Sequence, residues 1–281
     1  MKSKMNILIA GGDMRQVFCA DKLAENYNVC ITGFNSDLTC ESILRNDFFD
    51  CLVLPVPPLD EKGNINTPCS ESKISLDDLS KYLKKDCLIF TGRSDKRLDE
   101  FFSQNEIIDY MSLEELTLKN AIPTAEGAVK IALDELPVTL NRLPVLIVGM
   151  GRIGTALVEI LKGFGADITV AVHNAKGSAK ARIHGIKSVC TKDMDTGYGL
   201  VFNTVPKLIF TREILKKFDS NTLFIDLASR PGGFDFEAAA ELGKTVIWAL
   251  GLPGKTAPVT AGEFVAESIS YILTERSESN E

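Results

Sequence analysis

The sequence has few of the residues from which histidine-based catalytic sites and metal sites are built. Only two histidines, His173 and His184, occur in 281 residues, and none of the seven cysteines belongs to a Cys-x-x-Cys pair. A metal site with several histidines or closely spaced cysteines is therefore not expected. We expect the cysteines to be reduced and mostly buried, because a free cysteine packs as a small apolar side chain.

An excess of positive charge and long hydrophobic runs are missing as well. Lys and Arg number 31 against 38 Asp and Glu, so the formal net charge is −7. Broad nucleic-acid binding needs a basic face and is not expected. No apolar run approaches the roughly 20 residues that span a bilayer, and the short run after Lys4 lacks the features of a secretory signal. We predict a cytoplasmic protein without membrane contact.

The sequence does contain a regular alternation of short apolar runs and amphipathic stretches. Its 281 residues, of which 45% are hydrophobic, suffice for two domains with substantial cores. Runs such as ILIA at residues 7–10 are apolar throughout, which is typical of parallel strands buried on both faces. The alternation predicts the α/β class, with two Rossmann-like βαβ domains, the second a dinucleotide-binding doubly wound parallel sheet.

Ten strands are expected, five in each half of the chain. Their ranges are 5–10, 28–32, 51–54, 87–90 and 107–109, then 145–148, 168–172, 200–205, 223–227 and 245–249. Helices are expected at 14–25, 75–84, 95–102, 120–140, 152–164, 175–184, 211–217, 236–242 and 257–273. The predictions depend on hydrophobic periodicity and on nearby Gly and Pro residues.

The predicted domain organisation has four parts. Residues 1–120 form an α/β domain on the substrate side, and residues 121–142 form a linker helix that ends near Pro137. Residues 143–253 form the NAD(P)-binding domain. Residues 254–281 form a C-terminal helix that returns to the first domain, and its polar end is predicted to be a disordered tail.

The strongest functional signal is a glycine pattern after the sixth predicted strand. Gly149, Gly151 and Gly154 form G-x-G-x-x-G, with Arg152 and Ile153 in the same turn. The first glycine permits a tight turn, the second lets a pyrophosphate approach the backbone, and the third lets helix and strand pack closely. The helix N-terminus adds N–H groups and positive potential. We predict dinucleotide binding here; the alternative is a glycine-rich turn without a ligand.

The acidic residue that usually selects NAD is missing from this sequence. Such a residue follows the glycines by about 20 positions and binds the ribose 2′-hydroxyl. Here His173 and Asn174 stand at that place, and Lys176, Ser178, Lys180 and Arg182 follow. Cations would pair with a 2′-phosphate, so we predict NADP, with NAD possible. Alternatively, these cations form only a solvated helix face and His173 is only a strand-end residue.

Two later strand ends are expected to border the nicotinamide and its ribose, because ligands lie beyond the carboxyl ends of open α/β sheets. One is the turn FNTVP and the other begins FIDLASRPGG. The predicted contacts from these turns are Asn203, Thr204, Val205, Pro206, Ala228 and Ser229. The alternative is a pair of ordinary strand-exit turns.

No motif marks a general acid or base, so the catalytic residues are candidates by position only. Arg15 in AGGDMRQ and Arg93 in FTGR each follow a predicted strand, and a guanidinium can bind a carboxylate bidentately. Lys255 lies in the loop after the last strand and could reach the substrate. Each arginine could instead form a structural ion pair. The base is left open among Asp13, Glu126, Lys255 and Ser229.

Several strings together resemble the family of dipicolinate synthase A subunits. They are GGDMRQ, LPVP, NAIPTAEGAVKIALDELPVTL, VGMGRIG, FNTVP, DLASRPGGFDF and ALGLPGKTAPVTAGEF. The resemblance implies a sporulation oxidoreductase that oxidises a dihydrodipicolinate-type precursor, on a branch of the lysine pathway, to dipicolinate (pyridine-2,6-dicarboxylate). It also implies that the partner is the flavoprotein-like B subunit of dipicolinate synthase, and that the protein works in the mother cell of a sporulating bacterium.

A small dicarboxylate substrate would suit the two arginines, and we further expect a homo-oligomer. Two alternatives stay open. The first is a relative of amino-acid or 2-hydroxy-acid dehydrogenases, although those families commonly place a histidine in the cleft and both histidines here fall in the cofactor half. The second is a non-catalytic NADP-binding module that organises a partner subunit.

Overall fold

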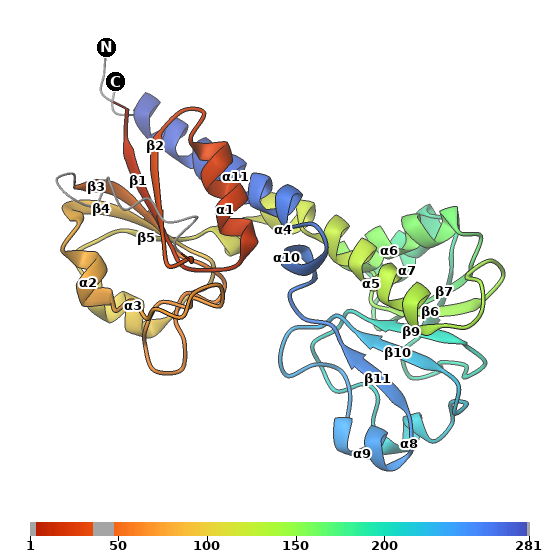
Figure 1. The fold of residues 1–281 in the computed structure, drawn as a ribbon. Coiled ribbons are helices and arrows are strands. Elements are labelled where there is room, and N and C mark those ends of the chain that lie inside the picture. The colour runs from red at the N-terminus through yellow and green to blue at the C-terminus, as the bar shows by residue number, and fades with distance from the viewer. Residues whose placement is uncertain (1–3, 36–47, 280–281) are drawn as a thin grey trace. The chain divides into compact units, whose positions relative to one another are not determined.

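The computed structural model describes residues 4–35 and 48–279; Cys40 and the last two residues of the expected tail lie outside this part. The chain divides into two compact units (Figure 1). The first comprises Met1–Asn120 and Ala257–Glu281, and the second comprises Ala121–Thr256. Each unit is a parallel sheet covered by helices, as predicted.

The first unit has a five-stranded sheet in the order β2-β1-β3-β4-β5. Its strands are β1 (Asn6–Ala10), β2 (Asn28–Thr32), β3 (Phe49–Val53), β4 (Leu83–Thr91) and β5 (Ile107–Asp109). β1 pairs with β2 on one side and with β3 on the other. The strand order therefore reverses beside β1, and the carboxyl ends of β1 and β3 form the switch point at which α/β proteins commonly bind ligands.

Helices cover both faces of the first sheet. One face carries α1 (Met14–Leu23), α4 (Glu114–Lys119), α11 (Pro258–Ser279) and a short 3₁₀ helix at Tyr110–Ser112; the other carries α2 (Leu76–Ser80) and α3 (Lys96–Phe101). α11 lies along α1 (Figure 1). Gly262 permits this approach, because a Cβ there would lie 2.4 Å from the carbonyl oxygen of Arg15.

The C-terminal helix is longer than the sequence suggested. Residues 275–279, expected in a disordered tail, continue α11 to Ser279. The Ser279 hydroxyl donates to the carbonyl oxygen of Glu275, and Arg276 forms an ion pair with Glu106. These contacts satisfy polar groups that we expected to be solvated, so the helix persists through a polar sequence.

The second unit has a six-stranded sheet in the order β11-β10-β9-β6-β7-β8. Its strands are β6 (Pro144–Val148), β7 (Asp167–Val172), β8 (Lys187–Cys190), β9 (Leu200–Asn203), β10 (Leu223–Asp226) and β11 (Thr245–Trp248). Read from β8, this is the Rossmann order 3-2-1-4-5-6. β8 was not predicted, because it is a short edge strand without a fully buried residue.

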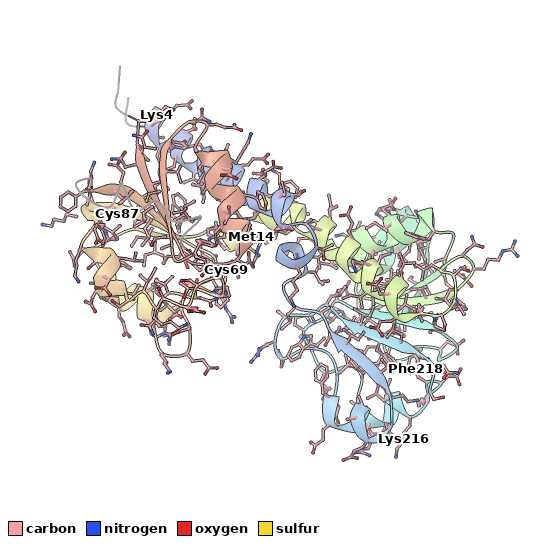
Figure 2. All side chains as sticks on the ribbon, in the orientation of Figure 1. Lys4, Met14, Cys69, Cys87, Lys216 and Phe218 are labelled. Atoms are coloured by element: carbon pink, nitrogen blue, oxygen red, sulfur yellow. The ribbon has the colours of Figure 1, made fainter. Side chains whose placement is uncertain are left out.

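One face of the second sheet carries α5 (Ala121–Glu135), α6 (Arg152–Gly163), α7 (Ala175–Ile183) and α10 (Leu252–Thr256). The other carries α8 (Arg212–Leu215) and α9 (Phe236–Glu241). Phenylalanines fill the core under α8 and α9, among them Phe218 (Figure 2) and the stacked pair Phe210 and Phe234. α5, which we expected to be a linker, groups with the second unit.

The described cysteines are free thiols, and Cys19, Cys30, Cys51 and Cys87 are buried. Burial raises the pKa of the Cys51 and Cys87 thiols to about 12, so both are neutral at physiological pH. Among the helices of the described residues, none has the length and apolarity needed to cross a bilayer.

Candidate functional site

The carboxyl ends of neighbouring strands in the second sheet surround a pocket of about 600 Å³. Its lining comes from the turns that follow β6, β7, β8 and β9. Among the described residues that line it, none is acidic and three are lysines, although the chain as a whole is acidic. The lining therefore favours an anionic ligand of substantial size.

The three glycines of the turn after β6 serve different purposes. Gly149 has φ +100°, and a Cβ on it would lie 2.4 Å from Thr204 Oγ1. A Cβ on Gly154 would lie 2.2 Å from the Gly149 carbonyl oxygen. Gly151, by contrast, has φ −85°, and a Cβ there would meet no described atom within 4 Å. Packing within the protein requires glycine at positions 149 and 154, whereas Gly151 leaves open space in the pocket.

The start of α6 is open to a ligand. Gly151 is the N-cap, and within the described part of the chain no side chain caps the helix. The first N–H groups of a helix have no intrahelical acceptor, and its N-terminus attracts negative charge. An uncapped helix start beside the open space over Gly151 fits the pyrophosphate of a dinucleotide.

The turn after β7 supplies the predicted polar residues His173, Asn174 and Lys176, all of which line the pocket. Asn174 caps α7, since its Oδ1 accepts a hydrogen bond of 2.8 Å from the Gly177 N–H. Its Nδ2 lies 3.1 Å from His173 Nε2. Asn174 therefore fixes the start of α7, and with it the position of Lys176.

Only part of the predicted basic cluster on α7 lines the pocket. Lys180 lines the pocket, whereas Ser178 and Arg182 do not. Lys176 and Lys180 are four residues apart and so share one face of the helix. The Ser178 hydroxyl instead lies 2.9 Å from that of Ser188 on β8. The prediction counted cations in the sequence without assigning them to helix faces.

The turn after β9 contributes Thr204, Val205 and Pro206, as predicted. Thr204 Oγ1 donates to the Val148 carbonyl oxygen at 2.8 Å and so ties this turn to the end of β6. The lining continues beyond the predicted residues with Lys207, Leu208 and Ile209, and also includes Met150, Ala171, Val172, Gly177 and Thr191. Lys207 follows directly after FNTVP and could have been included from the sequence.

Six further predicted residues do not line the pocket: Arg152, Ile153, Gly154, Asn203, Ala228 and Ser229. Ile153 packs against the core of the second unit. Asn203 is fully buried and donates a hydrogen bond to Asp226, and Ala228 is almost fully buried. Ser229 is exposed on the loop after β10. The pocket therefore does not support the predicted contacts between these residues and a cofactor.

In the first unit, Arg15 forms the ion pair that we had considered as its alternative role. Arg15 Nε and Nη2 donate to Asp13 Oδ1 and Oδ2 at 2.9 and 2.8 Å. Burial favours the neutral forms, but the hydrogen bonds and opposite charges outweigh it: the pKa of Asp13 is lowered and that of Arg15 is raised. Asp13 also caps α1, and its charge adds to burial in raising the pKa of Cys69 (Figure 2).

Beside Arg15 lies a small cavity of about 10 Å³ that Gln16 and Tyr110 also line. Its volume suits about one water molecule. Tyr110 Oη donates to the Leu54 carbonyl oxygen at 2.8 Å, and burial raises the Tyr110 pKa, so this residue supports the end of β3 as a neutral donor.

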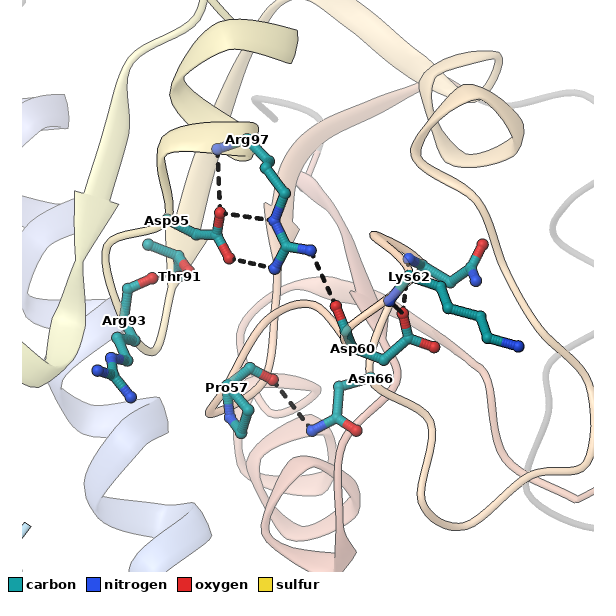
Figure 3. Close-up of polar contacts among 9 residues, drawn as sticks. Pro57, Asp60, Lys62, Asn66, Thr91, Arg93, Asp95 and Arg97 are labelled. Atoms are coloured by element: carbon teal, nitrogen blue, oxygen red, sulfur yellow. Dashed lines mark hydrogen bonds and ion pairs between the residues drawn. The ribbon is translucent and has the colours of Figure 1, made fainter. Parts of the chain in front are cut away.

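Arg93 lies at the end of β4 and is exposed (Figure 3). Its carbonyl oxygen accepts a hydrogen bond of 2.9 Å from Thr91 Oγ1. Within the described ranges, its guanidinium has no carboxylate partner at ion-pair distance, whereas nearby Arg97 binds Asp95 and the carbonyl oxygen of Asp60. Arg93 is therefore better able than Arg15 to bind an incoming carboxylate.

The other catalytic candidates are less constrained by the structure. Lys255 is exposed on α10 in the second unit, and Glu126 is exposed on α5. His184 lies 2.7 Å from Glu159, but this pair lies outside the pocket lining. Among the described residues that line the pocket, there is thus no histidine–carboxylate pair.

Comparisons with known proteins agree with this geometry. Residues 6–111 match the model of the N-terminal domain of the dipicolinate synthase A subunit. The chain is 29% identical over 295 residues to the dipicolinate synthase A subunit of Bacillus subtilis, covering 98% of each sequence. The crystal structure of the corresponding protein from Bacillus halodurans superposes with a TM-score of 0.87 at 27% identity, covering 97% of this chain and 99% of the other. The resemblance to the family of dipicolinate synthase A subunits is confirmed.

Residues 124–238 match the NAD-binding domain of D-isomer specific 2-hydroxyacid dehydrogenases. A transhydrogenase from Sinorhizobium meliloti shares the fold, with a TM-score of 0.71 at 13% identity over 97% of this chain and 94% of the other. The predicted α/β class with Rossmann-like units is therefore confirmed. The chain is an NAD(P)-dependent oxidoreductase, and a nicotinamide dinucleotide is its cofactor.

Proposed function

We propose that this chain oxidises a dihydrodipicolinate-type precursor to dipicolinate with NADP as the electron acceptor. The match of residues 6–111 to the N-terminal domain of dipicolinate synthase A subunits is the observation that carries this proposal. NAD-binding domains occur in many dehydrogenases, so the second unit alone says little about the substrate. The first unit distinguishes this chain from other dehydrogenases.

The preference for NADP is supported by charge in the pocket. Lys176 and Lys180 of α7 line it together with Lys207 of the turn after β9. At the end of β7, where NAD-specific sites carry a carboxylate, the chain has His173 and Asn174. Cations would stabilise a 2′-phosphate by charge-assisted hydrogen bonds. Lys180 therefore joins Lys176 as a proposed 2′-phosphate ligand, in place of Ser178 and Arg182.

The substrate's carboxylates are proposed to bind to arginines of the first unit. Arg93 offers a guanidinium without a carboxylate partner among the described residues, and Arg15 lies at the switch point with part of its fork already bound to Asp13. The remaining N–H groups of Arg15 could still donate to a second carboxylate. Both residues would orient the substrate and balance its charge. Lys255 stays a candidate for contact with the reacting ring.

The proposed reaction balances as a dehydrogenation. When bound, the oxidised nicotinamide supplies an acceptor for a hydride from the substrate ring. Loss of one proton to water or a basic side chain then gives the aromatic pyridine dicarboxylate. Among the considered bases, Asp13 is ion-paired and its pKa is lowered, so it is a weak base; Glu126, Lys255 and Ser229 remain.

The partner and cellular setting are part of the same proposal. The Bacillus relatives are named as one subunit of a synthase, which supports a complex with a second, different subunit. We propose the flavoprotein-like B subunit of dipicolinate synthase as that partner, homo-oligomerisation of this chain, and a cytoplasmic location in the mother cell of a sporulating bacterium.

An assay with the purified full-length chain tests the proposal. The chain, with and without the partner subunit, is incubated with the lysine-pathway precursor and NADP or NAD. We expect equal amounts of NADPH and of an ultraviolet-absorbing pyridine dicarboxylate, with slower turnover when NAD replaces NADP. A Gly151→Asp variant serves as the control for background aromatisation. Product formation without NADPH in the complete reaction would contradict the proposal.

A second candidate is a dehydrogenase for amino or 2-hydroxy acids, because residues 124–238 match a 2-hydroxyacid dehydrogenase domain. The placement of both histidines in the second unit argues against it. Oxidation of NADPH by 2-keto acids, in the absence of any dihydropyridine activity, would favour this candidate. Cofactor binding without turnover of any of these acids would favour the non-catalytic module.

A further inference from the structure

A fully buried pair of polar side chains joins the ends of β9 and β10. Asn203 and Asp226 pair in register on the two strands, and both have 0% of their surface exposed. Asn203 Nδ2 donates to Asp226 Oδ1 at 2.7 Å. Burial of a carboxylate is costly unless hydrogen bonds compensate for lost water, so the other partners of this pair indicate its role.

Each side chain also binds the backbone of the turn that follows its own strand. Asn203 Nδ2 donates to the Val205 carbonyl oxygen at 3.0 Å, and its Oδ1 accepts from the Val205 N–H at 3.2 Å. Asp226 Oδ1 accepts from the Ala228 N–H at 3.1 Å, and Oδ2 accepts from the Gly233 N–H at 2.8 Å. The bond between the two side chains therefore couples the two turns.

The surroundings leave little room for movement. A Cβ on Gly233 would lie 2.1 Å from Asn203 Nδ2, and one on Gly232 would lie 2.8 Å from Asp226 Oδ2. Trp248 Nε1 donates to the Ala228 carbonyl oxygen at 2.9 Å. Both backbone polar groups of Ala228 are thus hydrogen-bonded within the protein, which restrains this loop.

We propose that Asn203 and Asp226 are positioning residues that hold the turns after β9 and β10 at the spacing required by the nicotinamide half of the cofactor. This rests on the proposed function. In a sheet of the Rossmann order, the half that contains β9, β10 and β11 binds the second mononucleotide, whereas β6 and β7 bind the adenosine half. Disturbing the pair should therefore affect the two halves of the cofactor differently.

The hydrogen-bond pattern requires a carboxylate at position 226. Both oxygens of Asp226 accept, Oδ1 from Asn203 and Ala228 and Oδ2 from Gly233. An Asp226→Asn variant keeps the shape but replaces one oxygen with a donor. Either orientation of the amide then places a donor against a donor, so the loop after β10 must shift.

The experiment compares Asp226→Asn and Asn203→Ser with a Thr222→Val control. Asn203→Ser keeps the two backbone N–H groups that donate to Asp226. It is the variant to compare if Asp226→Asn does not fold. Thr222 is 1% exposed, and its Oγ1 donates to the Tyr198 carbonyl oxygen at 2.9 Å. Its replacement removes a buried hydrogen bond next to the opposite end of β10. For each protein, one measures Tm, kcat, KM and the affinity for 2′-phospho-ADP-ribose, which lacks nicotinamide.

The chain has a single tryptophan, Trp248, which is hydrogen-bonded to the loop after β10. Its fluorescence therefore reports on the position of the nicotinamide ring. Energy transfer from Trp248 to the reduced nicotinamide of bound NADPH, measured at saturation and normalised to the Trp248 emission, depends on where the ring sits. This readout separates a displaced nicotinamide from a general loss of stability.

For Asp226→Asn we expect 2′-phospho-ADP-ribose affinity within about threefold of wild type, since the adenosine half is untouched. Energy transfer should fall, and kcat should fall at least about tenfold. Asn203→Ser should show the same split to a smaller extent, and Thr222→Val should lower only Tm. Unchanged kcat and energy transfer, or parallel loss of both ligands with Tm, would overturn the proposal. Failure of the wild-type protein to turn over would instead refute the proposed function, and the positioning role with it.

Discussion

The helices α1 and α6, each of which follows the first strand of its sheet, differ in how their N-termini are capped. In the first unit, Asp13 caps α1 with its carboxylate; in the second, the N-cap of α6 is Gly151 and no side chain of the described residues caps the helix. Because a helix N-terminus attracts negative charge, α1 obtains that charge from within the chain, whereas α6 leaves the position to an external anion.

The surroundings of the two helix starts differ in the same sense. Beside α1, the charge of Arg15 is already balanced by Asp13, and the adjacent cavity is about 10 Å³. Beside α6, three lysines line a pocket of about 600 Å³. Two sheets of the same α/β class thus carry different sites, because a few residues of the turns, rather than the architecture, determine what binds.

Giving α6 a cap like that of α1 should have the largest effect. In Gly151→Asp, a carboxylate would occupy the position of the pyrophosphate, so NADPH affinity should fall at least about 100-fold, or about 2.8 kcal/mol. Fluorescence titration measures the affinity. Gly163→Ala, at the opposite end of α6 and equally open, is the control and should bind NADPH normally. Normal binding by Gly151→Asp would show that no pyrophosphate lies there.

Removing the positive charge of the pocket should weaken NADP more than NAD. The double variant Lys176→Ala and Lys180→Ala should lose about 10- to 100-fold in NADP affinity, which is equivalent to one charge-assisted hydrogen bond of about 1.5–3 kcal/mol. NAD affinity should change by less than about threefold. Arg182→Ala, on the same helix but outside the lining, should change neither. An equal loss of affinity for both cofactors would indicate that the two lysines form only a solvated helix face.

The two neighbouring arginines of the first unit should differ in function. Arg93→Ala should raise KM for the dicarboxylate about tenfold without a change in Tm, because its guanidinium is proposed to bind substrate. Arg97→Ala should leave KM unchanged and lower Tm, since Arg97 binds Asp95 and the Asp60 carbonyl oxygen (Figure 3). Steady-state kinetics and thermal unfolding check both. The reverse pattern would exclude Arg93 as a substrate ligand.

The smallest effect is expected from the Asp13–Arg15 pair. Asp13→Asn keeps a capping oxygen but loses the ion pair, which should cost about 0.5–1 kcal/mol at pH 7 because solvent partly screens it. The folded pKa of Asp13 is lowered, so its stabilising effect is present above its ordinary value near 4 and is lost as pH falls through the folded value. Denaturant unfolding of both proteins should therefore converge below about pH 4. A constant difference down to pH 2 would contradict this account.

Local sequence patterns predicted most of the fold because they act over a few residues. Continuous apolar runs located β1, β2, β6 and β7 to within a residue at each end. β8 was not predicted because its sequence, KSVC, contains no apolar run. This strand is only partly buried at the sheet edge. α4 and α10 were missed because short helices depend on tertiary packing more than on propensity.

The cofactor site was predictable where backbone geometry alone defines it. Gly149, Gly151 and the turn after β9 lie where the glycine pattern and the FNTVP string placed them. Side-chain direction was not predictable: Asn203 points into the core toward Asp226, and Ser178 toward Ser188. Those directions depend on partners 23 and 10 residues away.

The sequence by itself determined the two βαβ series and the uncapped glycine turn, since hydrophobic periodicity and the absence of a Cβ are properties of neighbouring residues. Only the tertiary structure decided which lysines share a pocket, which arginine is already paired, and how Asn203 and Asp226 join two turns. These depend on strands and helices that meet only after folding, when burial makes each unpaired polar group costly and so selects its partner.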